Sequence, residues 1–137
     1  MQKRGFTLIE LLVVIAIIGI LVTIVLVGFG TIRQDAKNAN IKGNMAQMRL
    51  AVEMFYNDNT TYTGASAETS YGAALSSAED QLPSGTTCLA NGGHFSDTEF
   101  CLECPMVGGG FWCVDSDGYM GEIAASACDG TDFDCQP

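Results

Sequence analysis

The chain opens with a long, uninterrupted run of apolar residues. Leu11 to Phe29 is a stretch of nineteen residues without a charged side chain. At about 1.5 Å per residue, a helix of this length matches the hydrocarbon core of a bilayer, which is roughly 30 Å thick. The first part of the chain is therefore predicted to form a helix that can span a membrane.

Beyond this run the apolar residues recur every three or four positions, which is the period of an amphipathic helix. Because the sequence has no proline between Phe6 and Tyr56, we expect one helix there, ended by the polar residues Asn57 to Asn59. Its apolar face is predicted to pack on a sheet. The stripe consists of Ile41, Met45, Met48, Val52 and Phe55, and Met54 is expected in the same core.

The remainder of the chain contains short segments with turn residues between them. Residues 70–82 carry a modest helical pattern that stops at Pro83. This helix belongs to a segment rich in Thr, Ser, Ala and Gly that is expected to connect the long helix to the sheet.

The sheet is predicted mainly from one hairpin signal. Phe111–Ser116 and Tyr119–Ile123 are strand-like and flank Asp117-Gly118, a pair typical of a tight turn with positive φ at both positions. A strand over Phe100–Met106 and a loop at Gly108–Gly110 complete it. The predicted fold class is α+β, with a long N-terminal helix packed on a small antiparallel sheet of three or four strands and a disulfide-braced C-terminal loop.

Charge is distributed unevenly along the chain. All six Lys and Arg residues lie before position 50, so the first 49 residues carry a net charge of +4 and the remaining 88 carry −14. An acidic domain repels phosphate backbones, so we expect no direct nucleic-acid binding by the C-terminal part. Lys3 and Arg4 favour a cytoplasmic N-terminus and an outward-facing acidic part.

The cysteines all lie in the acidic part. An even number of cysteines in a short exported segment is typical of a disulfide framework formed in an oxidising compartment. Six cysteines allow fifteen pairings; we expect Cys113 to pair with Cys128 or Cys135. The disulfide candidates are Cys88, Cys101, Cys104, Cys113, Cys128 and Cys135.

The cysteines are also candidates for a redox site or a metal site. Cys101 and Cys104 form a C-x-x-C pair, which occurs in redox sites and as half of a zinc site. No βαβ pattern surrounds it, and His94 is the only histidine. A four-cysteine metal site formed by Cys88, Cys101, Cys104 and Cys113 stays open as an alternative. A lone histidine cannot serve a nucleophile-base-acid set, so no catalytic residues and no enzymatic activity are predicted.

An acidic residue lies just inside the apolar run. An ionised carboxylate at the depth of Glu10 is costly unless it is paired, which makes it a functional hypothesis. The segment Lys3-Arg4-Gly5-Phe6-Thr7-Leu8-Ile9-Glu10-Leu11-Leu12, followed by the apolar helix, resembles the class III leader of type IV pilins and of type II secretion pseudopilins. The resemblance implies that a prepilin peptidase cleaves after Gly5, removes residues 1–5 and methylates the new amine of Phe6.

The resemblance also implies how the subunits assemble. Glu10 would neutralise the Phe6 amine of a neighbouring copy in an apolar surrounding, where such a pair is strong. Because the contact joins different surfaces of identical subunits, it generates an open helical filament. Residues 6–29 would form the membrane-spanning and filament-core half of the helix, residues 30–56 its amphipathic half, and residues 57–137 the acidic head.

The implied function is a structural subunit of a type IV pilus-like filament. Its partners would be further copies of itself, the prepilin peptidase, the pilus assembly machinery and, before assembly, the inner membrane; its final location would be an extracellular pilus.

Two alternatives stay open. One is a type II secretion pseudopilin, which would be periplasmic; major pseudopilins bind calcium, and apart from calcium no cofactor is predicted. The calcium candidates are Asp129, Asp132 and Asp134; if they bind no calcium, they form a solvated acidic turn. The other alternative is a membrane-anchored, cysteine-rich redox or metal-binding module.

Overall fold

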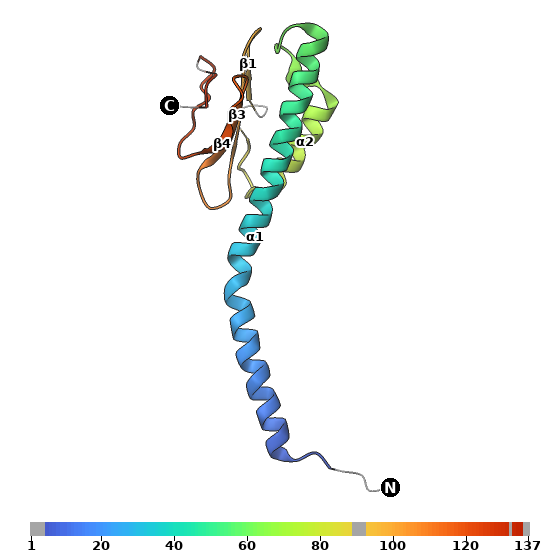
Figure 1. Cartoon of the computed structure of the whole chain (residues 1–137), viewed down its shortest axis with the longest axis vertical. Coiled ribbons are helices and arrows are strands. Elements are labelled where there is room, and N and C mark those ends of the chain that lie inside the picture. Colours follow the sequence, from blue (N-terminus) through green and yellow to red (C-terminus); the bar gives the residue numbers. More distant parts are fainter. Residues whose placement is uncertain (1–4, 89–92, 132, 136–137) are drawn as a thin grey trace. The chain divides into compact units, whose positions relative to one another are not determined.

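The computed structural model of the chain describes residues 5–88, 93–131 and 133–135. These residues form one long helix, two short helices and four strands (Figure 1). The chain divides into two compact units, Met1–Arg33 and Gln34–Pro137. The helix α1 (Leu8–Asn59) contributes to both units, and all other elements belong to the second.

The first unit presents apolar side chains on every side of α1. An 18-residue window of this helix has a mean hydropathy of 3.3, and none of its described side chains is buried within the chain. By length and composition the helix can cross a membrane, as the sequence predicts. It begins at Leu8, two residues after the predicted start at Phe6.

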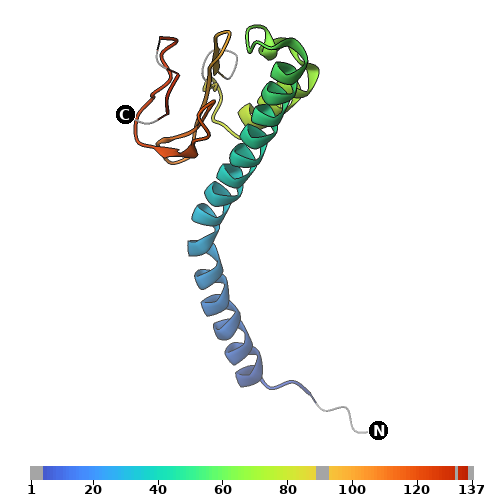
Figure 2. The same cartoon turned by 45° about the horizontal axis from the view of Figure 1, so that its top comes forward.

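The second unit is built around an antiparallel sheet in the order β1-β2-β3-β4. The strands are β1 (Gly93–Phe95), β2 (Phe100–Pro105), β3 (Phe111–Asp115) and β4 (Met120–Ile123). The end of α1 and the helix α2 (Thr69–Glu79), preceded by the short turn η1 (Ala65–Ala67), cover one face of this sheet. The C-terminal segment covers the other face (Figure 2). The sheet is therefore the middle layer of the head.

The helix-facing core confirms the predicted stripe. Ile41, Met45, Met48 and Val52 are completely buried, and Phe55 packs against them from a half-buried position. The prediction for Met54 is wrong, since its side chain is 62% exposed. Two residues along a helix correspond to a turn of about 200°, so Met54 lies almost opposite Val52.

Polar contacts also connect α1 to the sheet and to the loop between β2 and β3 within the second unit. The Asn38 amide accepts a hydrogen bond from the Val107 N–H (2.8 Å) and donates one to the Val107 carbonyl (3.0 Å). The Lys42 ammonium contacts the Glu122 carboxylate at 2.5 Å and lies 4.7 Å from the centre of the Trp112 ring. The loop that Asn38 holds contains Gly108–Gly110, which all have positive φ, as the predicted loop requires.

The hairpin between β3 and β4 forms, but its turn differs from the prediction. Val114 pairs with Met120, so five residues separate the last paired positions. Gly118 has a φ of 103°, whereas Asp117 is not among the described residues with positive φ. The tight two-residue turn is therefore wrong, because the Asp115 carboxylate and backbone close a wider loop by bonding the backbone of Tyr119.

The end of α1 also differs from the prediction. The helix includes Asn57 to Asn59, and the Asn59 side chain donates a hydrogen bond to the Phe55 carbonyl (2.9 Å). The chain leaves the helix at Thr60, which has a φ of 58°. Helices commonly end in this left-handed conformation, but the residue that adopts it is usually glycine.

Replacing Thr60 by glycine is expected to stabilise the head. A β-branched residue is strained at positive φ, so Thr60→Gly should raise the free energy of unfolding by about 1 kcal/mol. Chemical denaturation of the full chain in detergent micelles measures this change. Thr61→Gly is the matched control: the Thr61 hydroxyl donates to the Asp97 carboxylate (3.0 Å), so that variant should be less stable than the parent. A Thr60→Gly variant that is no more stable than the parent would contradict the interpretation.

Candidate functional site

The N-terminal end of α1 is organised by a reciprocal pair of hydrogen bonds. The Glu10 carboxylate accepts hydrogen bonds from the Thr7 backbone N–H (2.9 Å) and the Thr7 hydroxyl (2.7 Å). The Glu10 N–H in turn donates to the Thr7 hydroxyl oxygen at 3.4 Å. This is a capping box, which satisfies backbone donors that the first helical turn leaves open. It explains why α1 begins at Leu8.

The capping role of Glu10 is absent from the sequence interpretation, although Thr7 and Glu10 have the T-x-x-E spacing that signals it. The predicted processing site lies immediately before this cap. Phe6 is 74% exposed, and nothing lies within 4 Å of a side chain built at Gly5. The basic residues Lys3 and Arg4 lie outside the described residues.

The sheet face that looks away from α1 carries a second group of polar and sulfur side chains. Neighbouring positions on one face of a strand are two residues apart, so Cys101 and Glu103 share this face on β2. Cys113 and Asp115 do the same on β3. The register places Cys101 opposite Asp115 and Glu103 opposite Cys113. All four side chains are buried.

The two carboxylates on this face bind the backbone of the C-terminal segment. Glu103, which is 1% exposed, accepts hydrogen bonds from the Ala127 N–H (2.9 Å) and the Cys128 N–H (3.3 Å). Asp115, also 1% exposed, accepts one from the Cys135 N–H at 3.1 Å and one from the Tyr119 N–H at 2.8 Å. A buried carboxylate is tolerated when such donors surround it. The pair therefore holds the C-terminal segment against the sheet.

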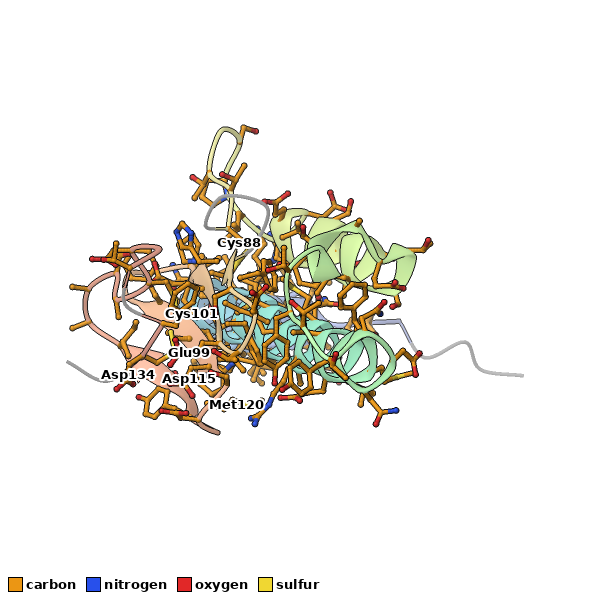
Figure 3. The ribbon with its side chains drawn as sticks, turned by 90° about the horizontal axis from the view of Figure 1, so that it is seen from above. Cys88, Glu99, Cys101, Asp115, Met120 and Asp134 are labelled. Atoms are coloured by element: carbon orange, nitrogen blue, oxygen red, sulfur yellow. A yellow bond between two sulfur atoms is a disulfide. The ribbon has the colours of Figure 1, made fainter. Side chains whose placement is uncertain are left out.

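Two of the three disulfides join the same surfaces, and none of the cysteines is free. Cys113 pairs with Cys135, one of the two partners that the sequence analysis expected. In Figure 3, Cys101 and Asp115 lie at the sheet, and Asp134 lies on the C-terminal segment beyond it. The three bonds are Cys88–Cys104, Cys101–Cys128 and Cys113–Cys135.

The proposed metal site of Cys88, Cys101, Cys104 and Cys113 is wrong. Cys101 and Cys104 are three residues apart on one strand, so they point to opposite faces of the sheet. Cys104 and Cys88 belong to the helix-facing core, whereas Cys101 and Cys113 lie in the opposite cluster. For the same reason the C-x-x-C pair cannot close a disulfide of its own.

The calcium candidates stay a prediction. Asp129 and Asp134 are exposed, and Asp132 lies outside the described residues. One oxygen of Asp129 accepts hydrogen bonds from the backbone N–H and the hydroxyl of Thr131, at 2.9 and 2.7 Å. This is a local turn interaction that orders the loop by itself.

Comparisons with known proteins match the N-terminal part of the chain. A family described as the prokaryotic N-terminal methylation motif matches residues 1–26. A probable minor fimbrial protein of Dichelobacter nodosus is 41% identical over 63 residues, which are 46% of this chain and 40% of that protein. The type IV major pilin protein PilA of Myxococcus xanthus is 37% identical over 62 residues, covering 45% of this chain and 28% of PilA.

A third relative is also named as a type IV pilus component. The type IV narrow pilus major component PilA5 of Thermus thermophilus is 47% identical over 51 residues, or 37% of this chain and 44% of PilA5. The matches thus span less than half the length of each of these relatives. No solved structure matches the chain significantly.

These matches and the fold together characterise the two parts of the chain. Residues 1–26 carry the prepilin-type methylation motif and include the start of a long apolar helix, and the rest of the chain forms an α+β head closed by three disulfides. The relatives with which this N-terminal part is shared are type IV pilins and fimbrial proteins, so this part of the chain is similar to the corresponding part of those proteins.

Proposed function

We propose that this protein is a structural subunit of a type IV pilus-like filament, assembled through its N-terminal helix after leader cleavage and methylation. The proposal rests on the exposed apolar surface of α1 in the first unit of the chain. Its described apolar side chains are exposed on all sides, and the match to the methylation motif over residues 1–26 includes most of them. Such a helix requires a lipid or protein environment. The membrane supplies that environment before assembly, and further copies of the chain supply it in the filament.

The pairing of Glu10 with the Phe6 amine is the second element of the proposal. Cleavage after Gly5 creates a positive charge one residue before the Thr7 amide that already donates to Glu10. In the bilayer the capping box stabilises the end of α1. In the filament the same carboxylate neutralises the amine of an adjacent subunit, and the head-to-tail repetition of this contact extends the helix of subunits.

The pilus function is favoured over the two alternatives. The relatives described above are named as pilus or fimbrial proteins, which supports an extracellular pilus rather than a periplasmic pseudopilus. All six cysteines are engaged in disulfides, which argues against a thiol-based redox module. The prepilin peptidase and the pilus assembly machinery are the partners that this function requires, and a structural role calls for no catalytic site.

The intact mass of the chain, recovered from a sheared cell-surface fraction, tests this proposal. We expect a chain that lacks Met1 to Gly5, carries one added methyl group, and gains six hydrogens on reduction of its three disulfides. A chain that stays in the membrane with residues 1–5 attached would contradict the proposal. A processed chain that never reaches the surface would favour the pseudopilin instead.

A further inference from the structure

The sulfur atoms on the outer sheet face, which is the face that looks away from α1, form one compact group. The Sγ atoms of Cys101, Cys113, Cys128 and Cys135 all lie within 4.8 Å of one another, and all four residues are buried. They form two disulfides, Cys101–Cys128 and Cys113–Cys135, which lie side by side. The sulfur-to-sulfur distances between the two bonds are 3.7 Å for Cys101 to Cys113, 3.9 Å for Cys101 to Cys135 and 3.7 Å for Cys113 to Cys128.

These distances have the size that a tetrahedral metal site requires. Zinc bound to four thiolates has Zn–S bonds of about 2.3 Å, so the edges of its sulfur tetrahedron are about 3.8 Å long. Three of the six edges already have this length in the disulfide-bonded chain. Two further edges are the bonded pairs Cys101–Cys128 and Cys113–Cys135, whose sulfurs can move apart once the disulfides are reduced. Rotation about the cysteine side-chain bonds can supply that separation without moving the strands.

We propose that the head, when these four cysteines are thiols, binds one zinc ion through Cys101, Cys113, Cys128 and Cys135. Binding is a ligand exchange without electron transfer: four S–H bonds lose their protons to solvent and four Zn–S bonds form. Each sulfur serves either the metal or a disulfide, so the two states exclude each other. The chain is synthesised with thiols, so the site is available without a reductant only to a head that folds before its disulfides form.

Two features keep the ligands in place after the disulfides are opened. Cys101 and Cys113 lie on paired strands, whose ladder does not depend on sulfur. The backbone next to the other two sulfurs is held by carboxylates, because Glu103 binds the Cys128 N–H and Asp115 binds the Cys135 N–H. Partly buried apolar side chains shield the cluster from water, and these are Tyr119, Ile123 and Phe133. A buried, pre-positioned thiolate set is what a structural zinc site uses.

The third disulfide provides an internal comparison. Cys88 and Cys104 belong to the helix-facing core, on the other side of the sheet. A folded head therefore has four cysteines that can share a metal and two that cannot join them. An unfolded chain has no such division, because all six thiols are then equally available.

Metal titration of the reduced full chain tests the proposal. The chain in detergent micelles is reduced with a phosphine under anaerobic conditions and titrated with Co²⁺, followed by Zn²⁺. We expect one Co²⁺ per chain, the absorption of tetrahedral cobalt thiolate, and its loss when Zn²⁺ displaces the cobalt. Cys113→Ser should weaken binding by about a hundredfold or more, because one of four strong ligands is lost. The double variant Cys88→Ser/Cys104→Ser should bind as the parent does.

Alkylation of the unmutated chain provides a second readout. With Zn²⁺ present, iodoacetamide should modify Cys88 and Cys104 and leave the other four cysteines protected, as peptide masses would show. Failure to form the tetrahedral cobalt spectrum would overturn the proposal. Equal loss of binding in the Cys88→Ser/Cys104→Ser variant, or protection that does not distinguish four cysteines from two, would overturn it as well.

Discussion

Cells that express the Glu10→Gln variant are expected to have no filaments of this protein, although the processed subunit is present in their membrane. Glutamine keeps an amide oxygen that can accept the hydrogen bonds from Thr7, so the helix cap survives. It cannot neutralise the Phe6 amine of a neighbour. An amine left unpaired in an apolar assembly is strongly unfavourable, and this penalty recurs at every subunit. The amount of subunit in the sheared surface fraction should fall to below about one hundredth of the parent level.

The capping role of Glu10 calls for a control that separates the two functions. Thr7→Ala removes the cap hydroxyl, which costs a helix about 1 kcal/mol, and leaves the carboxylate of Glu10 intact. This variant should still assemble, provided that mass spectrometry shows normal cleavage after Gly5. Normal filaments from Glu10→Gln would contradict the pairing. Equal loss of filaments in the two variants would show that assembly is as sensitive to the cap as to the charge, and would contradict the assignment of the Glu10→Gln defect to the lost charge.

The elements that depend on local pattern were predictable from the sequence. The stripe from Ile41 to Val52 repeats at a helical period, and Gly108–Gly110 can adopt backbone angles that other residues avoid. The short strand β1 was not predicted individually, because three residues are too few to show a period. Likewise, the inclusion of Asn57 to Asn59 in α1 was not predicted, because polar residues of this kind are also typical of helix ends.

The role of the two carboxylates on the outer sheet face was not predicted from the sequence. Glu103 and Asp115 each follow a disulfide-bonded cysteine by two residues, as Cys101-Leu102-Glu103 and Cys113-Val114-Asp115. In a strand this spacing places the carboxylate on the same face as the disulfide, which is a usable signal. Apart from the Tyr119 N–H, however, their hydrogen-bond donors lie far away along the chain, at Ala127, Cys128 and Cys135. Only the tertiary arrangement brings these donors to the acids.

Removing one of these carboxylates is expected to destabilise the head strongly. Asp115→Ala leaves the buried Cys135 N–H and the part-buried Tyr119 N–H without their acceptor. An unsatisfied buried donor costs about 1–3 kcal/mol, so the free energy of unfolding should fall by about 3 kcal/mol in the disulfide-bonded chain. Denaturant titration of the full chain in micelles measures this loss. Hydrogen exchange should report faster exchange at the Cys135 amide, since the C-terminal segment loses a contact to the sheet.

Two further variants connect this loss to the hydrogen bonds rather than to the hairpin sequence. Asp115→Asn keeps one carbonyl oxygen and replaces the other by a donor, so it can satisfy one of the two N–H groups and should lose about half as much stability. Asp117→Ala changes an exposed acid in the same turn and should alter stability by less than about 0.5 kcal/mol. Equal destabilisation by Asp115→Ala and Asp117→Ala would show that the turn, and not the bond to Cys135, accounts for the effect. The graded order of the three variants is thus the result that identifies the buried carboxylate as the anchor of the C-terminal segment.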